Sequence, residues 1–284
     1  MRLAAFRSPS GGPQCGVVRG EELVSLAGAG FPDLLSVIRG GEQSLAKAAE
    51  WVSNPAAGSI FPLSSVKLLA PIPRPPKLLC IGLNYRDHAA ETNVPVPDVP
   101  TVFAKFSTAI IGPGDSIVLP KASSQPDYEA EFAFVIGKGG RHIPAARWAE
   151  HVFGYTMLND VSARDYQKAV SQWTMGKNFD TFAPMGPYLV TRDEIADPHT
   201  LDISLTLNGE LMQSSSTRNL VFGVPDLIAF LSSVLTLEPG DVVSTGTPAG
   251  VGFVRRPPRY LQPGDETVVR VQGLGELRNL VIAE

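Results

Sequence analysis

The 284-residue sequence predicts a mainly β protein with a few inserted helices, in which a sandwich or barrel-like roll follows a small α+β module. Three observations support this fold class. Short apolar runs alternate with Gly/Pro turns over most of the chain. The amino-terminal part instead reads as strand, turn and strand followed by helical spacing. The proline-rich segment 71–77 cannot form a helix, so we divide the chain into a module of residues 1–70 and a larger domain of residues 71–284.

The amino-terminal module begins with a predicted hairpin. Residues 3–6 and 15–18 are predicted strands, joined by a turn at residues 8–13. Apolar residues at helical spacing predict helices over residues 32–38 and 44–51. Arg2, Arg7 and Arg19 come before the first acidic residue, Glu21. This charge pattern faintly resembles a transit peptide, but the hairpin explains the segment better.

Strands dominate the predicted larger domain, each an apolar or alternating run bounded by turn residues. They cover residues 77–82, 101–106, 116–119, 128–136, 154–159, 188–191, 201–207, 241–245 and 267–271. Helices are predicted at three places. One has Pro225 in its first turn and runs through Val234, a short one covers residues 85–91, and one follows Asp160.

Composition and charge limit the classes of function. The formal net charge is −4 and no long run of Lys or Arg occurs, so we expect neither nucleic acid nor an anionic membrane as a partner. No stretch of about twenty apolar residues is present, so we expect no membrane span. Cys15 and Cys80 lie far apart among apolar neighbours, which favours a reducing compartment, and we expect a cytoplasmic protein. A small molecule is the expected partner.

Two carboxylates stand at the mouth of an apolar strand. Glu129 and Glu131 are two residues apart, so they point the same way, while Ala130, Phe132 and Phe134 pack on the other side. Like charges this close raise each other's pKa and destabilise the strand. A hard divalent cation such as Mg²⁺ or Mn²⁺ relieves that repulsion. The alternative, an edge strand with two solvated acids, stays open from spacing alone.

A third carboxylate, Asp160, follows the predicted strand 154–159. Its position at the carboxyl end of a strand suits a ligand that joins Glu129 and Glu131 at one cation. The alternative interpretation is that Asp160 caps the helix that follows, which is the commonest role of Asp at such a position.

A histidine and a glutamate share one face of the short helix 85–91. His88 and Glu91 are three residues apart, so the carboxylate can hold the imidazole and raise its basicity. Such a pair is suited to activating water. An ordinary surface ion pair is the alternative. The proline-rich segment 92–100 that follows has the composition of a hinge for a closing lid.

Three further polar residues are candidates for binding a ligand. Lys177 follows a glycine among apolar residues, where it can stabilise an enolate or a carboxylate, although an ion pair with Asp180 or Asp165 is the commoner explanation. Arg164 and Gln167 are three apart on the helix after Asp160, so both can reach a ligand there.

A loop rich in Gly and Thr follows the predicted strand 241–245. Residues 244–252 offer hydroxyl and backbone N–H groups to an anion, with a plain tight turn as the alternative. The sequence contains no G-x-S-x-G, H-E-x-x-H or C-x-x-C motif, so it does not support a serine hydrolase or a zinc enzyme.

Taken together, these motifs resemble the fumarylacetoacetate hydrolase family. The likeness covers about residues 70–284, and its strength is that five motifs occur in the family's order. They are GLNY at 82–85 with His88 and Glu91, DYEAE at 127–131, NDVSARD at 159–165 with Gln167, GK at 176–177 and TGTPAGVG at 245–252. The segments 171–177, 196–199 and 255–261 look most like the branch of fumarylacetoacetate hydrolase domain-containing protein 2 and the 2,4-diketo-3-deoxy sugar-acid hydrolases.

The resemblance implies a mixed β-sandwich roll as the catalytic domain and a homodimer. It further implies Mg²⁺ or Mn²⁺, with Ca²⁺ as a possible substitute, held by the residues that match the family's ligands: Glu129, Glu131 and Asp160. The resemblance also implies that His88 and Glu91 activate water and that Lys177 stabilises negative charge. The residues that grip the substrate are then Arg164, Gln167 and Thr247.

This site predicts a metal-dependent hydrolase that cleaves a C–C bond in a 1,3-diketo acid, an acylpyruvate or 2,4-diketo acid, through a metal-stabilised enolate. Water deprotonated by His88 attacks the distal carbonyl. Two alternatives on the same site are decarboxylation of oxaloacetate and keto–enol tautomerisation or isomerisation of 2-oxo acids, neither of which needs an attacking water. A structural cation site in an inactive binding protein is a third interpretation.

Overall fold

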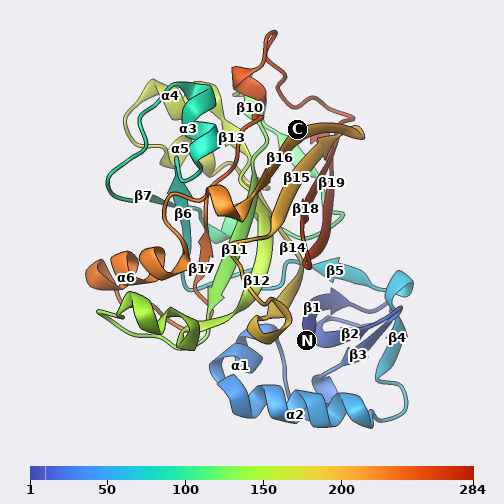
Figure 1. Ribbon diagram of the computed structural model, residues 1–284. Coiled ribbons are helices and arrows are strands. Elements are labelled where there is room, and N and C mark those ends of the chain that lie inside the picture. Colours follow the sequence, from blue (N-terminus) through green and yellow to red (C-terminus); the bar gives the residue numbers. More distant parts are fainter. Residues whose placement is uncertain (10) are drawn as a thin grey trace.

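The computed structural model describes residues 1–9 and 11–284 (Figure 1). Ser10, in the predicted turn 8–13, lies outside the described residues. Within the part described, two mixed sheets pack against each other: one of twelve strands and one of five. The fold is therefore mainly β with a few helices, as the sequence predicts.

The amino-terminal strands and helices form a lobe at the end of the larger sheet (Figure 1). Its elements are β1 (Arg2–Arg7), β2 (Pro13–Arg19), β3 (Glu22–Ser25), α1 (Leu34–Arg39), α2 (Gly41–Ser53), β4 (Ile60–Pro62) and β5 (Lys67–Leu69). The predicted hairpin is present, because β1 pairs with β2 along its whole length. The lobe shares the larger sheet, since Leu3 of β1 pairs with Leu189 of β14 (Ala183–Thr191). The division after residue 70 remains a proposal.

The rest of the larger sheet runs through the centre of the molecule. Its strands are β6 (Leu78–Gly82), β7 (Thr101–Ala104), β8 (Ile110–Ile111), β11 (Ala130–Ile136), β12 (Val152–Asn159), β14 (Ala183–Thr191) and β17 (Val242–Ser244). The strand order is β4-β3-β2-β1-β14-β12-β11-β17-β6-β7, with β5 beside β1 and β8 beside β14. The β17–β6 and β14–β8 pairs are parallel, which makes the sheet mixed.

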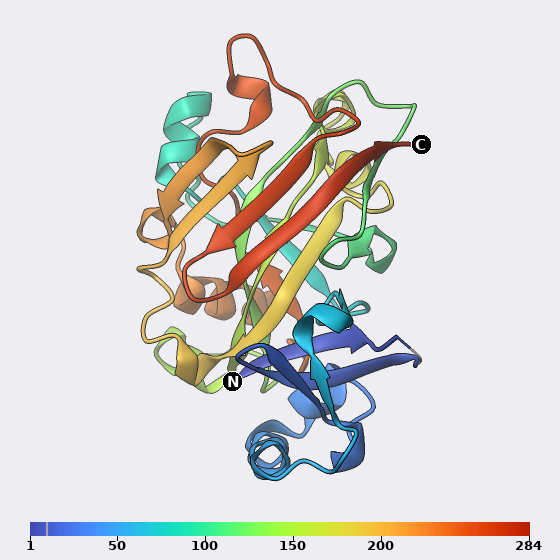
Figure 2. The same cartoon turned by 90° about the vertical axis from the view of Figure 1, so that its right-hand side faces the viewer.

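The five-stranded sheet lies over one face of this centre and faces the viewer in Figure 2. It has the order β16-β15-β18-β19-β9, formed by β9 (Ile117–Leu119), β15 (Asp202–Leu207), β16 (Glu210–Ser216), β18 (Glu266–Val271) and β19 (Gly275–Ala283). A separate short pair joins β10 (Pro126–Asp127) to β13 (Ser162–Ala163).

Four helices of the larger domain complete the described fold: α3 (Arg86–Thr92), α4 (Arg164–Ala169), α5 (Thr174–Lys177) and α6 (Val224–Val234). Figure 1 shows α3, α4 and α5 gathered at one end of the sheet, with α6 beside β17. Short 3₁₀ helices occupy Ala27–Ala29, Leu63–Ser65, Ser107–Ala109, Ala145–Glu150, Arg192–Glu194, Thr217–Asn219 and Gly252–Val254. Among the described residues, no helix is both long and apolar enough to span a membrane.

Strand β11 divides the two main hydrophobic cores. Phe132 and Phe134 belong to the core between the sheets, which α6 also fills. Ala133 and Val135 point the opposite way, into the core shared with the amino-terminal lobe. Because side chains alternate along a strand, Glu131 lies on the same side as Ala133, at the end of the strand where α3, α4 and α5 gather. The alternation thus turns an acidic residue inward, beneath these helices.

Candidate metal and acid–base site

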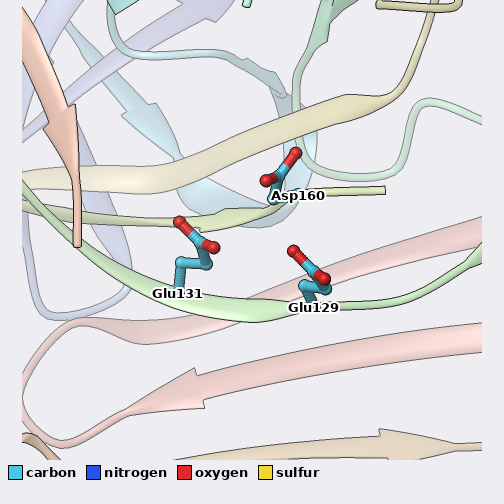
Figure 3. A group of neighbouring side chains, drawn as sticks. All are labelled: Glu129, Glu131 and Asp160. Carbon is cyan, nitrogen blue, oxygen red and sulfur yellow. The ribbon is translucent and has the colours of Figure 1, made fainter. Parts of the chain in front are cut away.

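Three buried carboxylates converge where β11 begins and β12 ends (Figure 3). Glu129 precedes β11, Glu131 lies within it and Asp160 follows β12, and one oxygen of each lies within 4.8 Å of the others. Their relative exposures are 5%, 2% and 0%. The register holds them together, since Ala130 pairs with Asn159 and the Asp160 N–H donates to the Glu129 carbonyl at 2.9 Å.

This geometry contradicts both alternatives left open by spacing. The acids are not solvated on an edge strand, because β11 lies between β12 and β17 inside the sheet. Asp160 is not a helix cap, because α4 begins four residues later with Ala163 at the N-cap.

Two buried lysines neutralise part of the cluster. Lys177 Nζ lies 2.7 Å from both Glu129 Oε2 and Asp160 Oδ2. Its ion-pair partners are thus site carboxylates, not Asp180 or Asp165. Lys105 Nζ donates to Asp160 Oδ1 at 2.7 Å, a contact that sequence reasoning missed. Burial opposes the charge of Lys177, but Asp160 and Glu129 outweigh this and raise its pKa.

The two glutamates have opposite electrostatic environments. Burial acts to raise the pKa of Glu129, but Lys177 and Arg164 outweigh it and lower the pKa to about 2. Burial, Asp160 and Glu129 raise the pKa of Glu131 well above its usual value. Glu131 accepts only from the hydroxyl of Ser244 and, at 3.2 Å, from the Gly246 N–H, and it has no ion pair among the described residues.

The residues present fit a divalent cation. Carboxylate oxygens are the ligands that Mg²⁺ and Mn²⁺ prefer. Glu131 has no ion pair among the described residues, and its raised pKa means that its charged form is disfavoured beside Asp160 and Glu129, so a cation held by all three would stabilise the carboxylate.

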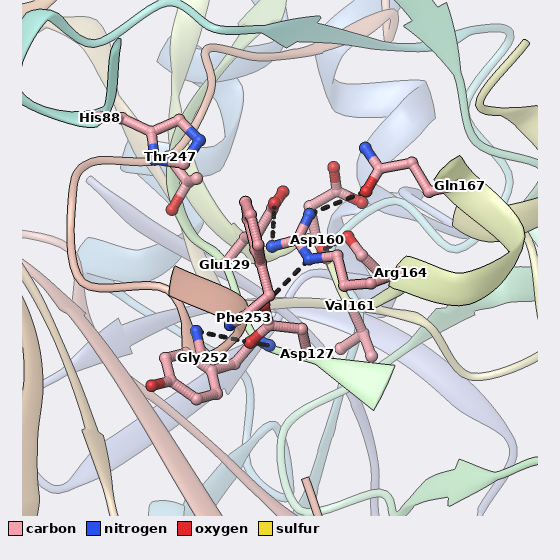
Figure 4. Close-up of polar contacts among 12 residues, drawn as sticks. His88, Asp127, Glu129, Asp160, Val161, Arg164, Gln167, Thr247, Gly252 and Phe253 are labelled. Atoms are coloured by element: carbon pink, nitrogen blue, oxygen red, sulfur yellow. Dashed lines mark hydrogen bonds and ion pairs between the residues drawn. The ribbon is translucent and has the colours of Figure 1, made fainter. Parts of the chain in front are cut away.

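Arg164 is held by acids on the floor of the site (Figure 4). Its Nε donates to Asp127 Oδ2 at 2.9 Å, and its Nη2 forms an ion pair with Glu129 Oε1 at 2.7 Å. Its Nη1 donates to Gln167 Oε1 at 2.9 Å, so the two predicted ligand-binding side chains are joined on α4. Asp127 was quoted from the sequence only as part of a motif, and its anchoring of Arg164 was missed.

The loop 244–252 binds the protein's own carboxylates. The Gly246 N–H donates to Glu131, the Gly250 N–H to Glu91 at 2.9 Å and the Gly252 N–H to Asp127 at 2.8 Å. The predicted anion site thus holds internal anions. Gly250 has φ +104°, and a Cβ there would lie 2.1 Å from the Met212 carbonyl oxygen, so glycine is required.

Thr247 lies at the centre of this loop. Its hydroxyl accepts from Gln213 Nε2 at 2.8 Å, and Gln213 Oε1 accepts from the Ala130 N–H at 2.9 Å. Gln213 was missed by sequence reasoning, yet it ties the loop to the start of β11, next to the carboxylate cluster.

His88 lines the cavity from α3, and Glu91 of the same helix holds it. His88 Nδ1 lies 2.7 Å from Glu91 Oε1, and both side chains are largely buried, so the pair is not an ordinary surface ion pair. The second oxygen of Glu91 accepts from Gly250, which fixes the carboxylate. With Nδ1 occupied by Glu91, Nε2 is the ring nitrogen left for a ligand.

One cavity of about 410 Å³ brings the predicted residues together. Its lining includes eight of them: His88, Glu129, Glu131, Asp160, Arg164, Gln167, Lys177 and Thr247. Glu91, the ninth, lies behind His88. Apolar side chains form much of the remaining wall, including Phe103, Trp173 and Phe253. A larger hollow of about 1030 Å³ next to the amino-terminal lobe contains none of the nine.

Comparisons with known proteins agree with this geometry. Residues 77–282 match the family described as "Fumarylacetoacetate (FAA) hydrolase C-terminal". A Bos taurus protein named "oxaloacetate tautomerase FAHD2B, mitochondrial" is 44% identical over 99% of this chain and 92% of its own length.

Two solved structures are similar over the whole chain. A fumarylacetoacetate hydrolase from Exiguobacterium antarcticum has a TM-score of 0.88 and 37% identity, covering 100% of both chains. Maleylpyruvate hydrolase from Sphingobium sp. SYK-6, in complex with manganese(II) and pyruvate, has a TM-score of 0.85 and 33% identity, covering 100% of this chain and 99% of that one.

Proposed function

The chain belongs to the fumarylacetoacetate hydrolase family, and from this premise we propose that it is a divalent-metal-dependent tautomerase that interconverts the keto and enol forms of oxaloacetate or a closely related 2-oxo acid. The observation that carries the proposal is the single cavity that holds the carboxylate cluster and the His88–Glu91 pair. The choice of reaction is supported by the relative that is 44% identical over nearly the whole chain.

Glu129, Glu131 and Asp160 are the proposed metal ligands. A bound Mg²⁺ or Mn²⁺ would supply Lewis-acid polarisation of the 2-oxo group. Polarisation makes the hydrogens on the neighbouring carbon, C3, more acidic, so the protein needs only one base of moderate strength near that carbon.

His88 is the proposed acid–base group. Its Nε2 takes a proton from C3, and the Glu91 carboxylate at Nδ1 stabilises the imidazolium that forms. The same nitrogen then gives the proton to the oxygen on C2, which yields the enol. The reverse sequence yields the keto form. No water takes part, and atoms and charge balance over the cycle.

The cations of the cavity complete the proposed mechanism. Lys177 supplies positive charge beside the oxygen on which negative charge develops. Arg164, with Gln167 beside it, is placed to bind the carboxylate next to the 2-oxo group. The Thr247 hydroxyl offers a further hydrogen bond from the opposite wall.

Hydrolysis of an acylpyruvate or other diketo acid is the second candidate, and the orientation of His88 suits it equally well. A histidine held by a carboxylate deprotonates water as readily as it moves a carbon-bound proton. Maleylpyruvate hydrolase, a structural relative at 33% identity, carries out a hydrolysis by its name. Decarboxylation of oxaloacetate would use the same cation site without the water.

A substrate screen with Mg²⁺ or Mn²⁺ distinguishes these reactions. Oxaloacetate added as its enol should lose enol absorbance faster with enzyme, with no release of pyruvate and CO₂. Two acids from an acylpyruvate would instead establish the hydrolase, and pyruvate with CO₂ from oxaloacetate the decarboxylase. Equal rates with metal and with a chelator would contradict all three. A homodimer is also proposed, and the mass in solution tests it.

A further inference from the structure

Two cations of the cavity share one aromatic ring. The guanidinium carbon of Arg164 lies 4.6 Å from the centroid of Phe253, and Lys168 Nζ lies 4.0 Å from the same centroid. All three residues line the cavity that contains the carboxylate cluster. Arg164 and Lys168 are four apart on α4, so both project from one face of that helix.

The two cations differ in what neutralises them. Arg164 is paired with Asp127 and Glu129, so carboxylates of the protein already balance its charge in the absence of a ligand. Lys168 forms neither an ion pair nor a hydrogen bond within the described residues, and its only polar contact there is the ring face. Burial, followed by the charge of Arg164, lowers the pKa of Lys168, so its charged form is disfavoured. An anion in the cavity would stabilise the charged form.

Phe253 keeps this ammonium at the cavity wall. The negative face of an aromatic ring attracts a cation, and desolvation strengthens the attraction. The Phe253 N–H donates to Asp127 Oδ2 at 3.0 Å, which fixes the backbone that carries the ring. Lys168 is an exposed residue, but its ammonium lies over this ring at the wall of the cavity.

We propose that Lys168 binds the second carboxylate of a dicarboxylic 2-oxo acid and so selects dicarboxylic over monocarboxylic substrates. The inference rests on the proposed function, in which the 2-oxo group and the first carboxylate lie at the metal cluster and Arg164. A four-carbon dicarboxylate is small against a cavity of about 410 Å³, so both ends fit within one space.

The test compares substrates that differ by one carboxylate. Exchange of C3 hydrogens in D₂O, followed by NMR, gives kcat/KM for oxaloacetate and for 2-oxobutanoate with the Mn²⁺-loaded enzyme. The ratio of the two values measures selectivity. Lys168→Met keeps the apolar stem on Phe253 and removes the charge, so the ratio should fall about tenfold, as expected for one partly exposed charge-assisted contact. Lys168→Arg should restore most of it.

A matched control is present elsewhere in the chain. Lys47 Nζ also stands over a phenylalanine, 5.4 Å from the centroid of Phe31, and lies outside the site. Lys47→Met should leave the selectivity ratio as in the unmodified enzyme. A ratio that Lys168→Met leaves unchanged, or that Lys47→Met lowers equally, would overturn the inference.

Binding of unreactive ligands separates this inference from the proposed function. Malate and lactate differ by one carboxylate and neither can tautomerise, so calorimetric titration of the Mn²⁺-loaded protein reports selectivity without turnover. Preference for malate that falls about tenfold in Lys168→Met supports Lys168 even if the enzyme exchanges neither keto acid, in which case only the proposed function fails. Equal affinities for malate and lactate in the unmodified protein would remove the basis of the inference.

Discussion

Lys177 Nζ lies 2.7 Å from Asp160 Oδ2, so a buried ammonium rests directly on a proposed metal ligand. The same nitrogen is 2.7 Å from Glu129 Oε2. Three acids in a buried cluster would repel one another, and Lys177 offsets that repulsion when no metal is bound. The lysine therefore stabilises the metal-free protein in addition to any role with substrate.

We expect Lys177→Met to lower the stability of the metal-free protein by about 3–5 kcal/mol, because it removes the one cation that pairs with both Glu129 and Asp160 and leaves each buried carboxylate with a single cationic partner. Mn²⁺ should restore more stability in this variant than in the unmodified protein, since the ion then compensates more charge. Thermal unfolding in chelator and in Mn²⁺ measures both effects. Lys67→Met, which breaks an exposed ion pair with Asp115, is the control and should change little. A smaller metal-induced shift in Lys177→Met would contradict this account.

Glutamine at positions 129 and 131 should have opposite effects on the metal-free protein. Glu131→Gln replaces a carboxyl whose charged form is already disfavoured and keeps an acceptor for Ser244, so stability in chelator should hold or rise. Glu129→Gln removes a carboxylate that pairs with both Lys177 and Arg164, so it should lower the stability of the metal-free protein. Both variants should lose the Mn²⁺-induced shift and metal-dependent turnover. Equal changes of stability in chelator for the two variants would show that the two acids share one electrostatic environment, which would contradict the structure.

Much of the fold could be predicted because apolar runs and turn residues mark the strands locally. All the strands predicted in the larger domain are present, most with ends shifted by one or two residues, although β14 begins at Ala183, five residues before the predicted start. The missed strands lack that signal. β16 ends in three serines, which pack poorly on a sheet. β19 places Asn279 among its buried residues, where its Nδ2 donates to the Gly112 and Asp115 carbonyls.

The site was predictable where its residues belong to motifs and unpredictable where they do not. Lys105 meets Asp160 across 55 positions and Gln213 meets Ala130 across 83, so only the folded chain reveals either contact. The type of reaction could not be predicted for a different reason. One carboxylate cluster with a His–Glu pair serves hydrolysis, decarboxylation and tautomerisation, and the sequence favoured hydrolysis. The name of a relative with 44% identity supports the tautomerase, which was the alternative.

Removal of the imidazole should separate binding from chemistry. We expect His88→Ala to lower tautomerisation by about 10²- to 10⁴-fold, the usual contribution of a positioned acid–base group. The Mn²⁺-induced rise in unfolding temperature should persist, because His88 is not a proposed ligand. Glu91→Gln keeps a hydrogen-bond acceptor at Nδ1 without the charge, so its tautomerisation rate should lie between those of the unmodified enzyme and His88→Ala. An unchanged rate in His88→Ala would assign the proton transfer to another group, whereas a decarboxylase could retain part of its rate.

A glycine in the 244–252 loop controls the position of Glu91. Gly250 has φ +104°, and an added Cβ would lie 2.1 Å from the Met212 carbonyl oxygen, so Gly250→Ala must move the backbone. That movement displaces the N–H that holds Glu91 at 2.9 Å and so disturbs His88.

Gly264 provides the matched control, because it has φ +93° and nothing lies within 4 Å of its added Cβ. Gly264→Ala should cost only the backbone strain of about 1–2 kcal/mol and leave kcat unaltered. Gly250→Ala should cost more and also lower kcat, since the strain and the steric clash add at a position that holds the acid–base pair. Urea unfolding and initial rates measure the two effects. If both variants lose the same stability and Gly250→Ala keeps full kcat, the loop does not position Glu91.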